Sequence, residues 1–438
     1  MKFTVVSLGC PKNLTDAEVL AGELLAAGHQ FVSDDSEAEA VIINTCAFLR
    51  SAVREAEGEI RHYLVFKKRG LYRKVIVTGC LSEAMGENLL KKYPGLNAVV
   101  GIHRLSDITK AFRKDGCYIT GQQDGPIYSP LNKMRFTAGH SAYLKIADGC
   151  DNRCAYCLIP FIRGRFRSKP LEQLVREAGD LADSGAVEIS LIAQDTTRYG
   201  EDIYGEPYLD RLLKELVKIK SVRWWRIMYA YPERVTDGLI SVMRDNGTVC
   251  RYLDIPLQHI STPVLRAMRR ISTEDSIKEK IESLRSAMPD IALRTNFIAG
   301  FPGETDKDAE KLVSFIKETK FSNVGVFEYS PEKGTAAAEM DGQIPEEVKH
   351  ARAEAVIEAQ SRVLDGLNKE LIGRETVFLA DSEDRGRAFW DAPDIDGSVV
   401  PESHAGLSAG KFYSGRIISA DAYVRKVNVS GPADGSKK

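Results

Sequence analysis

Short β-branched runs alternate with helical patterns through most of the chain, and this alternation limits the possible folds more than any other feature. In the first 115 residues the runs cover residues 3–8, 40–44, 74–78 and 97–100. Strands that are apolar on both faces and are joined by helices form parallel sheets covered on both sides. We therefore predict a doubly wound parallel sheet of the α/β class for residues 1–115.

A second alternating region begins near residue 136 and continues to about residue 370. Its six β-branched runs lie at residues 142–147, 187–192, 224–229, 251–256, 292–297 and 324–329. Six βα units of this length predict a partial (β/α)6 barrel, because a full eight-unit barrel would need more chain. Helical periodicity then stops, and residues 371–433 alternate like the strands of a small all-β barrel.

The predicted chain is therefore an α/β multidomain protein. Residues 116–135, rich in Gly, Gln and Pro, form the expected linker between the two α/β regions, and residues 434–438 form an expected disordered tail. The net charge of −2 shows no whole-chain basic excess of the kind that indicates a nucleic-acid partner. We expect no signal peptide, because the apolar run at residues 1–9 is too short and too quickly interrupted for one, and no apolar run approaches the ~20 residues that span a bilayer. We expect a cytoplasmic protein with no membrane partner.

Three cysteines lie close together after the first strand of the second region, in the segment Cys150-Asp-Asn-Arg-Cys154-Ala-Tyr-Cys157. This is the first βα loop, at the face where βα barrels place their active sites. A four-iron cluster usually takes four thiolates, so three would leave one iron open to a ligand. A zinc site is an alternative, although no fourth ligand is close in sequence. A Cys-x-x-Cys redox pair is another, although it leaves Cys150 unexplained.

This spacing, in this loop, resembles the radical S-adenosylmethionine superfamily, and Tyr156 before the last cysteine fits it. The resemblance implies that the open iron chelates the amino and carboxylate groups of S-adenosylmethionine, whose cleavage gives a 5′-deoxyadenosyl radical. It also implies cofactor contacts at Gln194 and Asp195. Further candidates for cofactor contacts, each with an ordinary loop or core role as the alternative, are Gln258, Arg294 and Asn296, and the glycine turn at Gly300.

A second set of cysteines is spread along the N-terminal region. Cys10, Cys46 and Cys80 each follow a predicted parallel strand within two residues of its end. Parallel strands joined by right-handed crossovers bring their carboxyl ends to one sheet edge, where ligands bind. We therefore predict a second three-thiolate site, with unrelated core cysteines as the alternative.

Two such sites in this domain order resemble the methylthiotransferase family over nearly the full chain. The resemblance implies an auxiliary four-iron cluster on Cys10, Cys46 and Cys80, a second cluster on Cys150, Cys154 and Cys157, and a C-terminal TRAM barrel. The stretches at residues 7–13, 254–261 and 391–397 resemble the ribosomal-protein-modifying RimO type more than the tRNA-modifying MiaB type.

The RimO resemblance implies an aspartate β-carbon on ribosomal protein twelve of the small subunit as the substrate, either free or in the subunit. The same resemblance implies that one S-adenosylmethionine methylates a sulfur at the auxiliary cluster, and that a second yields the radical that removes the β-hydrogen. It also implies a reductant such as flavodoxin or ferredoxin. The alternatives are a tRNA adenosine methylthiotransferase and a non-catalytic iron–sulfur or zinc protein that docks on the ribosome.

Charged stretches provide two further hypotheses. Residues 381–402 hold seven acids and two bases, which suits a basic ribosomal protein better than RNA, with a solvated acidic loop as the alternative. Arg163 and Arg165, with Arg167 and Lys169, follow the cysteine loop. One of them is a candidate to pair with the substrate carboxylate, and a solvated basic loop is the competing interpretation.

Overall fold

The computed structural model describes residues 1–119, 127, 133–403 and 406–434. Most of the expected linker (residues 120–126 and 128–132) and most of the expected tail (residues 435–438) lie outside the described residues. The chain forms two compact units. The first contains Met1–Phe136, Ala147–Lys169 and Glu332–Ala338, and the second contains Thr137–Ile146, Pro170–Pro331 and Glu339–Lys438. The loop that carries Cys150, Cys154 and Cys157 therefore packs with the N-terminal sheet.

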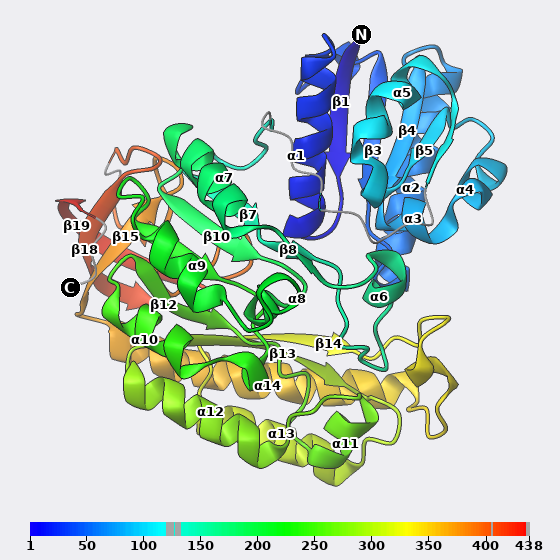
Figure 1. Cartoon of the computed structure of the whole chain (residues 1–438). Coiled ribbons are helices and arrows are strands. Elements are labelled where there is room, and N and C mark those ends of the chain that lie inside the picture. The colour runs from blue at the N-terminus through cyan, green and yellow to red at the C-terminus, as the bar shows by residue number, and fades with distance from the viewer. Residues whose placement is uncertain (120–126, 128–132, 404–405, 435–438) are drawn as a thin grey trace. The chain divides into compact units, whose positions relative to one another are not determined.

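The N-terminal sheet is parallel throughout, with strand order β2-β1-β3-β4-β5-β6 (Figure 1). The strands are β1 Lys2–Ser7, β2 Gln30–Phe31, β3 Ala40–Thr45, β4 Lys74–Gly79, β5 Ala98–Val100 and β6 Gly116–Tyr118. The predicted doubly wound sheet is confirmed. The first three residues of the expected linker form β6, which pairs with β5 as the edge strand. Strand β6, like the two-residue β2, is too short for its sequence to show the residue pattern that predicts a β-strand.

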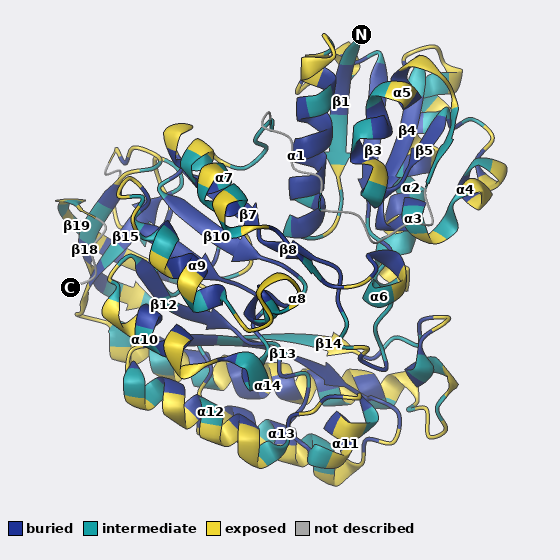
Figure 2. Ribbon diagram, in the orientation of Figure 1, coloured by how far each residue is buried: buried dark blue, intermediate teal, exposed yellow. Residues whose placement is uncertain are grey.

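Helices lie on both faces of this sheet, and its strands β3, β4 and β5 are buried between them (Figure 2). On one face α2 buries Ala56, Ile60 and Tyr63 at helical spacing, and on the other α1 buries Leu20 and Leu24. Each fully buried side chain of this size contributes about 1.5–3 kcal/mol to folding. The helical elements are α1 Pro11–Ala26, η1 Asp35–Glu37, α2 Arg50–Lys68, α3 Cys80–Met85, α4 Glu87–Lys92, η2 Ile102–Asp107 and α5 Ile108–Arg113.

The segment Ala147–Lys169 forms a loop closed at its base. Strand β8 (Ala147–Asp148) pairs with β9 (Arg167–Ser168), and the amide of Cys150 donates to the carbonyl of Gly164 at 3.1 Å. Gly149 has a φ of +79°, and a Cβ there would lie 2.0 Å from a backbone oxygen, so only glycine fits. One turn of helix, α6 (Ile159–Ile162), lies inside the loop.

The second unit contains a six-stranded parallel sheet with order β14-β13-β12-β11-β10-β7, which is open and confirms the predicted partial barrel. Its strands are β7 Ser141–Lys145, β10 Glu188–Ile192, β11 Trp224–Ile227, β12 Val249–Asp254, β13 Ala292–Ala299 and β14 Asn323–Glu328. The helical elements are α7 Leu171–Asp183, η3 Thr196–Arg198, α8 Glu201–Tyr204, α9 Leu209–Leu216, η4 Pro232–Arg234, α10 Asp237–Asp245, α11 Thr262–Ala267, α12 Glu274–Ala287, α13 Asp306–Thr319 and α14 Glu346–Leu371. The short helix η5 Ala336–Glu339 belongs, except for its last residue, to the first unit.

The C-terminal residues form a closed barrel with order β15-β16-β17-β19-β18, as predicted for a TRAM module. Its strands are β15 Glu375–Ala380, β16 Gly386–Ala388, β17 Ser398–Pro401, β18 Phe412–Ala420 and β19 Val424–Ala433. Phe378, Val399, Ile417 and Val427 fill its interior. Across the described part of the chain, no helix has the length and apolarity needed to cross a membrane.

Candidate functional site

The N-terminal cysteines lie at the topological switch point of their sheet. Strand order places β1, β3 and β4 side by side, and the chain reverses direction of winding between β1 and β3. Cys10 precedes α1 after β1, whereas Cys46 and Cys80 directly follow β3 and β4. Open parallel sheets bind ligands in the crevice at the carboxyl ends of strands around such a point. The topology thus brings three thiols from distant parts of the sequence to one edge.

Two glycines allow these strand ends to approach one another closely. Gly79 has a φ of +94°, and a Cβ there would lie 2.3 Å from the carbonyl oxygen of Thr45. A Cβ at Gly9 (φ +98°) would lie 2.9 Å from the Cβ of Cys46. L side chains rarely adopt such a backbone, so glycine is required at both positions. The backbone just before Cys10 and Cys80 is therefore shaped to bring the thiols together.

Asn13 fixes the turn that contains Gly9 and Cys10. Its Nδ2 donates to the carbonyl of Thr45 at 2.9 Å and to that of Leu8 at 3.2 Å. In return, Asn44 Nδ2 donates to the carbonyl of Asn13 at 2.6 Å. These bonds join the start of α1 to the end of β3, and so hold Cys10 beside Cys46.

Burial and nearby cations act in opposite directions on these thiols. Burial raises the pKa of Cys80 to about 11, against the influence of Arg163, and also raises the pKa of Cys46. Burial acts on Cys10 too, but Lys12, Arg163 and two amides of the first turn of α1 hold its pKa below the usual value. Cys10 and Cys46 each raise the pKa of Cys80, because a neighbouring thiolate disfavours a second negative charge.

The donor set fits an iron–sulfur cluster better than a single ion. All three cysteines are free of disulfide bonds. Among the described residues, no three Cys, His, Asp or Glu side chains gather as tightly as one metal ion would require. A four-iron cluster spreads its thiolate ligands over a larger core than a single ion does. Within the described part of the chain no fourth Cys, His, Asp or Glu gathers with these thiols, so they are suited to such a cluster with one open iron.

The second cysteine set is local and largely buried. The amide of Asn152 donates to Cys150 Sγ at 3.5 Å, and that of Ile159 donates to Cys157 Sγ at 3.4 Å. Burial raises the pKa of Cys157, and Cys154 and Cys150 raise it further, because a neighbouring thiolate disfavours a second negative charge. Amides aimed at sulfur stabilise anionic sulfur and tune a bound cluster. Tyr156 lies between the last two cysteines and is half-buried.

Most of the remaining predicted cofactor residues follow strands of the second unit at their carboxyl ends. Asp195 is buried, and its carboxylate accepts from Thr197 Oγ1 at 2.6 Å and from Arg234 at 3.0 Å. Gln194 precedes it after β10, and Gln258 follows β12 with a φ of +72°. The Gly300 amide after β13 donates to Glu304 at 2.9 Å. This common edge is where (β/α) folds bind ligands.

Arg294 and Asn296 lie within β13 instead of beyond its end. The Arg294 guanidinium pairs with Asp254 at 3.0 Å and with Asp396 of the C-terminal barrel at 3.4 Å. It also donates to Asn296 Oδ1 at 3.3 Å. The structure therefore gives Arg294 a packing role between sheet and barrel, and its cofactor contact, like that of Asn296, stays a prediction.

Arg163 does not lie where the sequence hypotheses placed it. Its side chain is 1% exposed and pairs with Asp16 at 2.9 Å and Asp148 at 3.1 Å. Lys169 is buried as well, so a solvated basic loop is wrong for both residues, and Arg163 has no exposed surface for a substrate carboxylate. Arg165 is exposed and keeps its place as a substrate candidate, and Arg167 donates to His103 at 3.2 Å.

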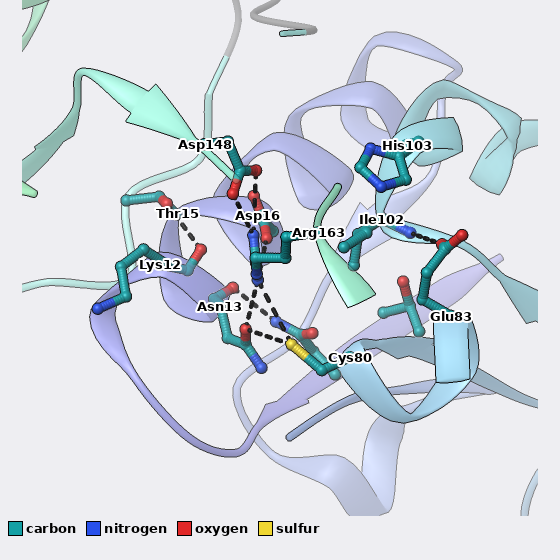
Figure 3. Close-up of polar contacts among 12 residues, drawn as sticks. Lys12, Asn13, Thr15, Asp16, Cys80, Glu83, Ile102, His103, Asp148 and Arg163 are labelled. Carbon is teal, nitrogen blue, oxygen red and sulfur yellow. Dashed lines mark hydrogen bonds and ion pairs between the residues drawn. The ribbon is translucent and has the colours of Figure 1, made fainter. Parts of the chain in front are cut away.

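Asn13, Asp16 and Asp148 were missed by the sequence reasoning, although they contact Arg163 (Figure 3). A signal for two of them exists in the sequence. Asn13 and Asp16 are polar residues three apart at the start of the mostly apolar helix α1, next to Cys10. Asp148 is the last residue of β8, just before the cysteine loop, and no sequence pattern marks that position.

The acidic segment of the C-terminal barrel is only partly on the surface. Asp391 is buried with Arg425 at 2.8 Å. The Asp396 side chain is 1% exposed beside Arg294, and Asp381 pairs with His140 and Arg387. A wholly solvated acidic loop is therefore wrong. The exposed charges that remain are the acids Glu383, Asp384, Asp394 and Glu402 and the base Arg385.

The comparisons with known proteins agree with this geometry. The family model described as the Radical SAM superfamily matches residues 144–316, and that of the uncharacterized protein family UPF0004 matches residues 2–101. A ribosomal protein uS12 methylthiotransferase RimO from Elusimicrobium minutum (strain Pei191) is 50% identical over 424 residues, covering 97% of this chain and 98% of that protein. This chain belongs to the RimO family. The RimO protein of Geobacter sulfurreducens is 44% identical, with 95% of each chain covered.

Solved structures support the fold of this RimO family member. The radical S-adenosylmethionine methyltransferase TsrM from Kitasatospora setae superposes with a TM-score of 0.55 at 16% identity, over 74% of this chain and 72% of that one. At that identity the likeness shows the fold alone. The resemblance drawn from the cysteine spacing and the three RimO-type stretches is confirmed, and the tRNA-modifying type is not favoured.

Proposed function

We propose that this chain transfers a methylthio group to the β-carbon of an aspartate in ribosomal protein uS12, using S-adenosylmethionine and two four-iron clusters. The observation that carries the proposal is the presence of both three-cysteine sets in one RimO family chain. Cys10, Cys46 and Cys80 gather at one sheet edge, and the local loop supplies the second set.

The protein residues have separable tasks in this reaction. Cys10, Cys46 and Cys80 hold the auxiliary cluster. Cys150, Cys154 and Cys157 hold the other, which supplies the electron for reductive cleavage of S-adenosylmethionine. The amides of Asn152 and Ile159 donate to two of the loop sulfurs, and the closed base of the loop keeps its thiols in register.

The residues that the family resemblance predicts as S-adenosylmethionine contacts are kept here as proposals. Tyr156, Gln194, Asp195, Gln258 and Gly300 are the proposed contacts. Asp195 is held by Thr197 and Arg234, so its carboxylate is fixed in place and would need no reordering when a ligand arrives. Arg294 and Asn296 are weaker candidates, because the Arg294 guanidinium is already paired with two carboxylates.

The proposed partners are uS12, either free or in the small subunit, and a reductant such as flavodoxin or ferredoxin. Four exposed acids against one exposed base between residues 381 and 402 give the C-terminal barrel an acidic surface there. Such a surface favours a basic protein partner over the phosphates of RNA.

The test is the intact mass of uS12 from cells that lack the gene. We expect loss of one methylthio increment, restored by the parent chain but not by Cys150→Ala or Cys10→Ala. Cys117→Ala, which alters a cysteine outside both sets, is the matched control and should restore the increment. An unchanged uS12 mass would contradict the substrate assignment and move the search to modified tRNA adenosines.

A further inference from the structure

Arg163 joins the two cysteine sites inside the first unit. It comes from the loop that carries Cys150, Cys154 and Cys157, yet its Nη2 lies 3.7 Å from Cys80 Sγ of the other set (Figure 3). The same nitrogen donates to Asn13 Oδ1 at 2.7 Å. A residue from one ligand loop thus places its charge against a ligand of the other site.

Two carboxylates hold this guanidinium in a single orientation. Nη1 contacts both oxygens of Asp148 at 3.1 Å, and Nη2 lies 2.9 Å from Asp16 Oδ2. Asp148 ends β8 two residues before Cys150, whereas Asp16 belongs to α1, which begins next to Cys10. Desolvating a cation costs several kcal/mol, and these two partners offset that cost. The position of the charge is therefore fixed by the fold and not by solvent.

A fixed cation at this distance favours negative charge on the sulfur and on whatever the sulfur binds. Cluster reduction adds one electron, so a nearby positive charge stabilises the reduced form and raises the reduction potential. Hydrogen bonds to the ligand sulfurs act in the same direction. Arg163 supplies both influences at Cys80.

We propose that Arg163 is a positioning residue for the auxiliary cluster, which raises that cluster's reduction potential through its contact with Cys80. The inference rests on the proposed function only in requiring that Cys10, Cys46 and Cys80 hold a cluster. Asp16 and Asp148 set the strength of the effect, because each withdraws part of the charge that Arg163 presents to the sulfur.

The experiment is a redox titration followed by electron paramagnetic resonance. The full chain carries Cys150→Ala, Cys154→Ala and Cys157→Ala, so that the auxiliary cluster alone gives the signal. Iron and sulfide contents are measured first on this parent. If the parent takes up no cluster, the proposed function fails at that step, which is distinct from a failure of the Arg163 proposal.

The charge-removing variant is Arg163→Met with Asp148→Asn, compared with Asp148→Asn alone. Asp148→Asn is included because Arg163→Met alone would leave two buried carboxylates, Asp16 and Asp148, without their cation. We expect the ratio of reduced to oxidised cluster at a fixed applied potential to fall about tenfold, which is about 59 mV for one electron. Arg163→Lys keeps the charge and should stay near the parent. Arg165→Ala, an exposed position in the same loop, should not shift the potential.

Asp16→Asn provides a second measurement that keeps Arg163 and changes no side-chain volume. Removing this carboxylate leaves more of the cation's charge at Cys80, so the potential should rise. The proposal is overturned if Asp16→Asn leaves the potential unchanged. It is also overturned if Arg163→Met with Asp148→Asn loads iron and matches Asp148→Asn alone. If the double variant loads no iron, the potentials of Asp16→Asn and Arg163→Lys, which both keep a cation at this position, decide the proposal.

Discussion

The two cysteine sets place the same number of thiols by different means. Cys150, Cys154 and Cys157 lie within one loop, whose base is closed by two strands and one hydrogen bond. Cys10, Cys46 and Cys80 are separated by more than thirty residues at each step, and adjacent parallel strands bring them together. One site depends on spacing along the chain, and the other depends on sheet topology.

This difference determines how each site can be recognised and damaged. A local motif is visible in the sequence and sensitive to any change of spacing within it. A site assembled from strand ends has no spacing to recognise, but tolerates changes in the loops between its strands. The backbone requirement is similar in both, since each has a glycine with positive φ just before a cysteine, at Gly79 and at Gly149.

The largest expected effect separates the chemical tasks of the two sites. Cys150→Ala should abolish both 5′-deoxyadenosine and methylthiolated product, because its cluster delivers the electron to S-adenosylmethionine. Cys10→Ala should abolish the product while 5′-deoxyadenosine still forms. Both compounds are measured by mass spectrometry under a chemical reductant, with Cys117→Ala as the control. Equal loss of 5′-deoxyadenosine in both variants would contradict this division of labour.

A single inserted residue tests spacing against topology. One alanine between Asn152 and Arg153 should eliminate the second cluster and leave the auxiliary cluster intact. One glycine after Gly70, in the exposed turn that follows α2, should leave both clusters, because β4 still pairs with β3. Iron content and paramagnetic signals report each cluster. Loss of the auxiliary cluster in the Gly70 insertion would mean that sheet topology alone does not position its ligands.

The sequence predicts the local site and most of the architecture, because both rest on local periodicity and spacing. It predicts the edge position of Cys10, Cys46 and Cys80 only through a rule of topology applied to predicted strands. It misses the ion pairs of Arg163 with Asp16 and Asp148, since these residues are 147 and 15 positions apart in the chain. Their proximity follows from packing in three dimensions. Because the sequence does not place these acids beside Arg163, a solvated basic loop was the competing interpretation.

Glycine substitutions compare the backbone requirements of the two sites. Gly79→Ala and Gly149→Ala should each lower the free energy of unfolding by about 3 kcal/mol, because a Cβ meets backbone atoms and φ is positive. Gly58→Ala in α2, where a Cβ meets nothing within 4 Å, should be neutral or stabilise by up to about 1 kcal/mol. Denaturant unfolding of the chain without iron measures all three. A neutral result at Gly79 would show that the edge site is less constrained than the loop.

The acidic segment of the C-terminal barrel, outside both cysteine sites, also shows that burial cannot be predicted from local sequence. Its composition predicted surface charge, yet Asp391 and Asp396 point inward to Arg425 and Arg294. Composition is local information, whereas burial is decided by which elements pack together. The pH dependence of stability can distinguish an inward carboxylate from an exposed one in the same loop.

Asp396→Asn gives an effect that is confined to neutral pH, with a sign that can be worked out. Burial raises the pKa of Asp396 from 3.8 to about 6, although Arg294 opposes the change. Between about pH 4 and 6 the folded chain therefore binds a proton that the unfolded chain has released. The contribution of this group to stability falls as pH rises through that window. At about 1.4 kcal/mol per pKa unit, the ionised group costs up to about 3 kcal/mol near neutral pH.

Asp396→Asn should therefore be more stable than the parent at pH 7.5 and nearly equal to it at pH 4, as measured by denaturant midpoints at both values. Arg294 keeps Asp254 as a partner in the variant, so no buried cation is left alone. Asp394→Asn, at an exposed position of the same loop, is the control and should show little change at either pH. A difference between Asp396→Asn and the parent that is the same at both pH values would mean that the inward carboxylate does not titrate between them, and that its environment resembles the surface which composition predicted.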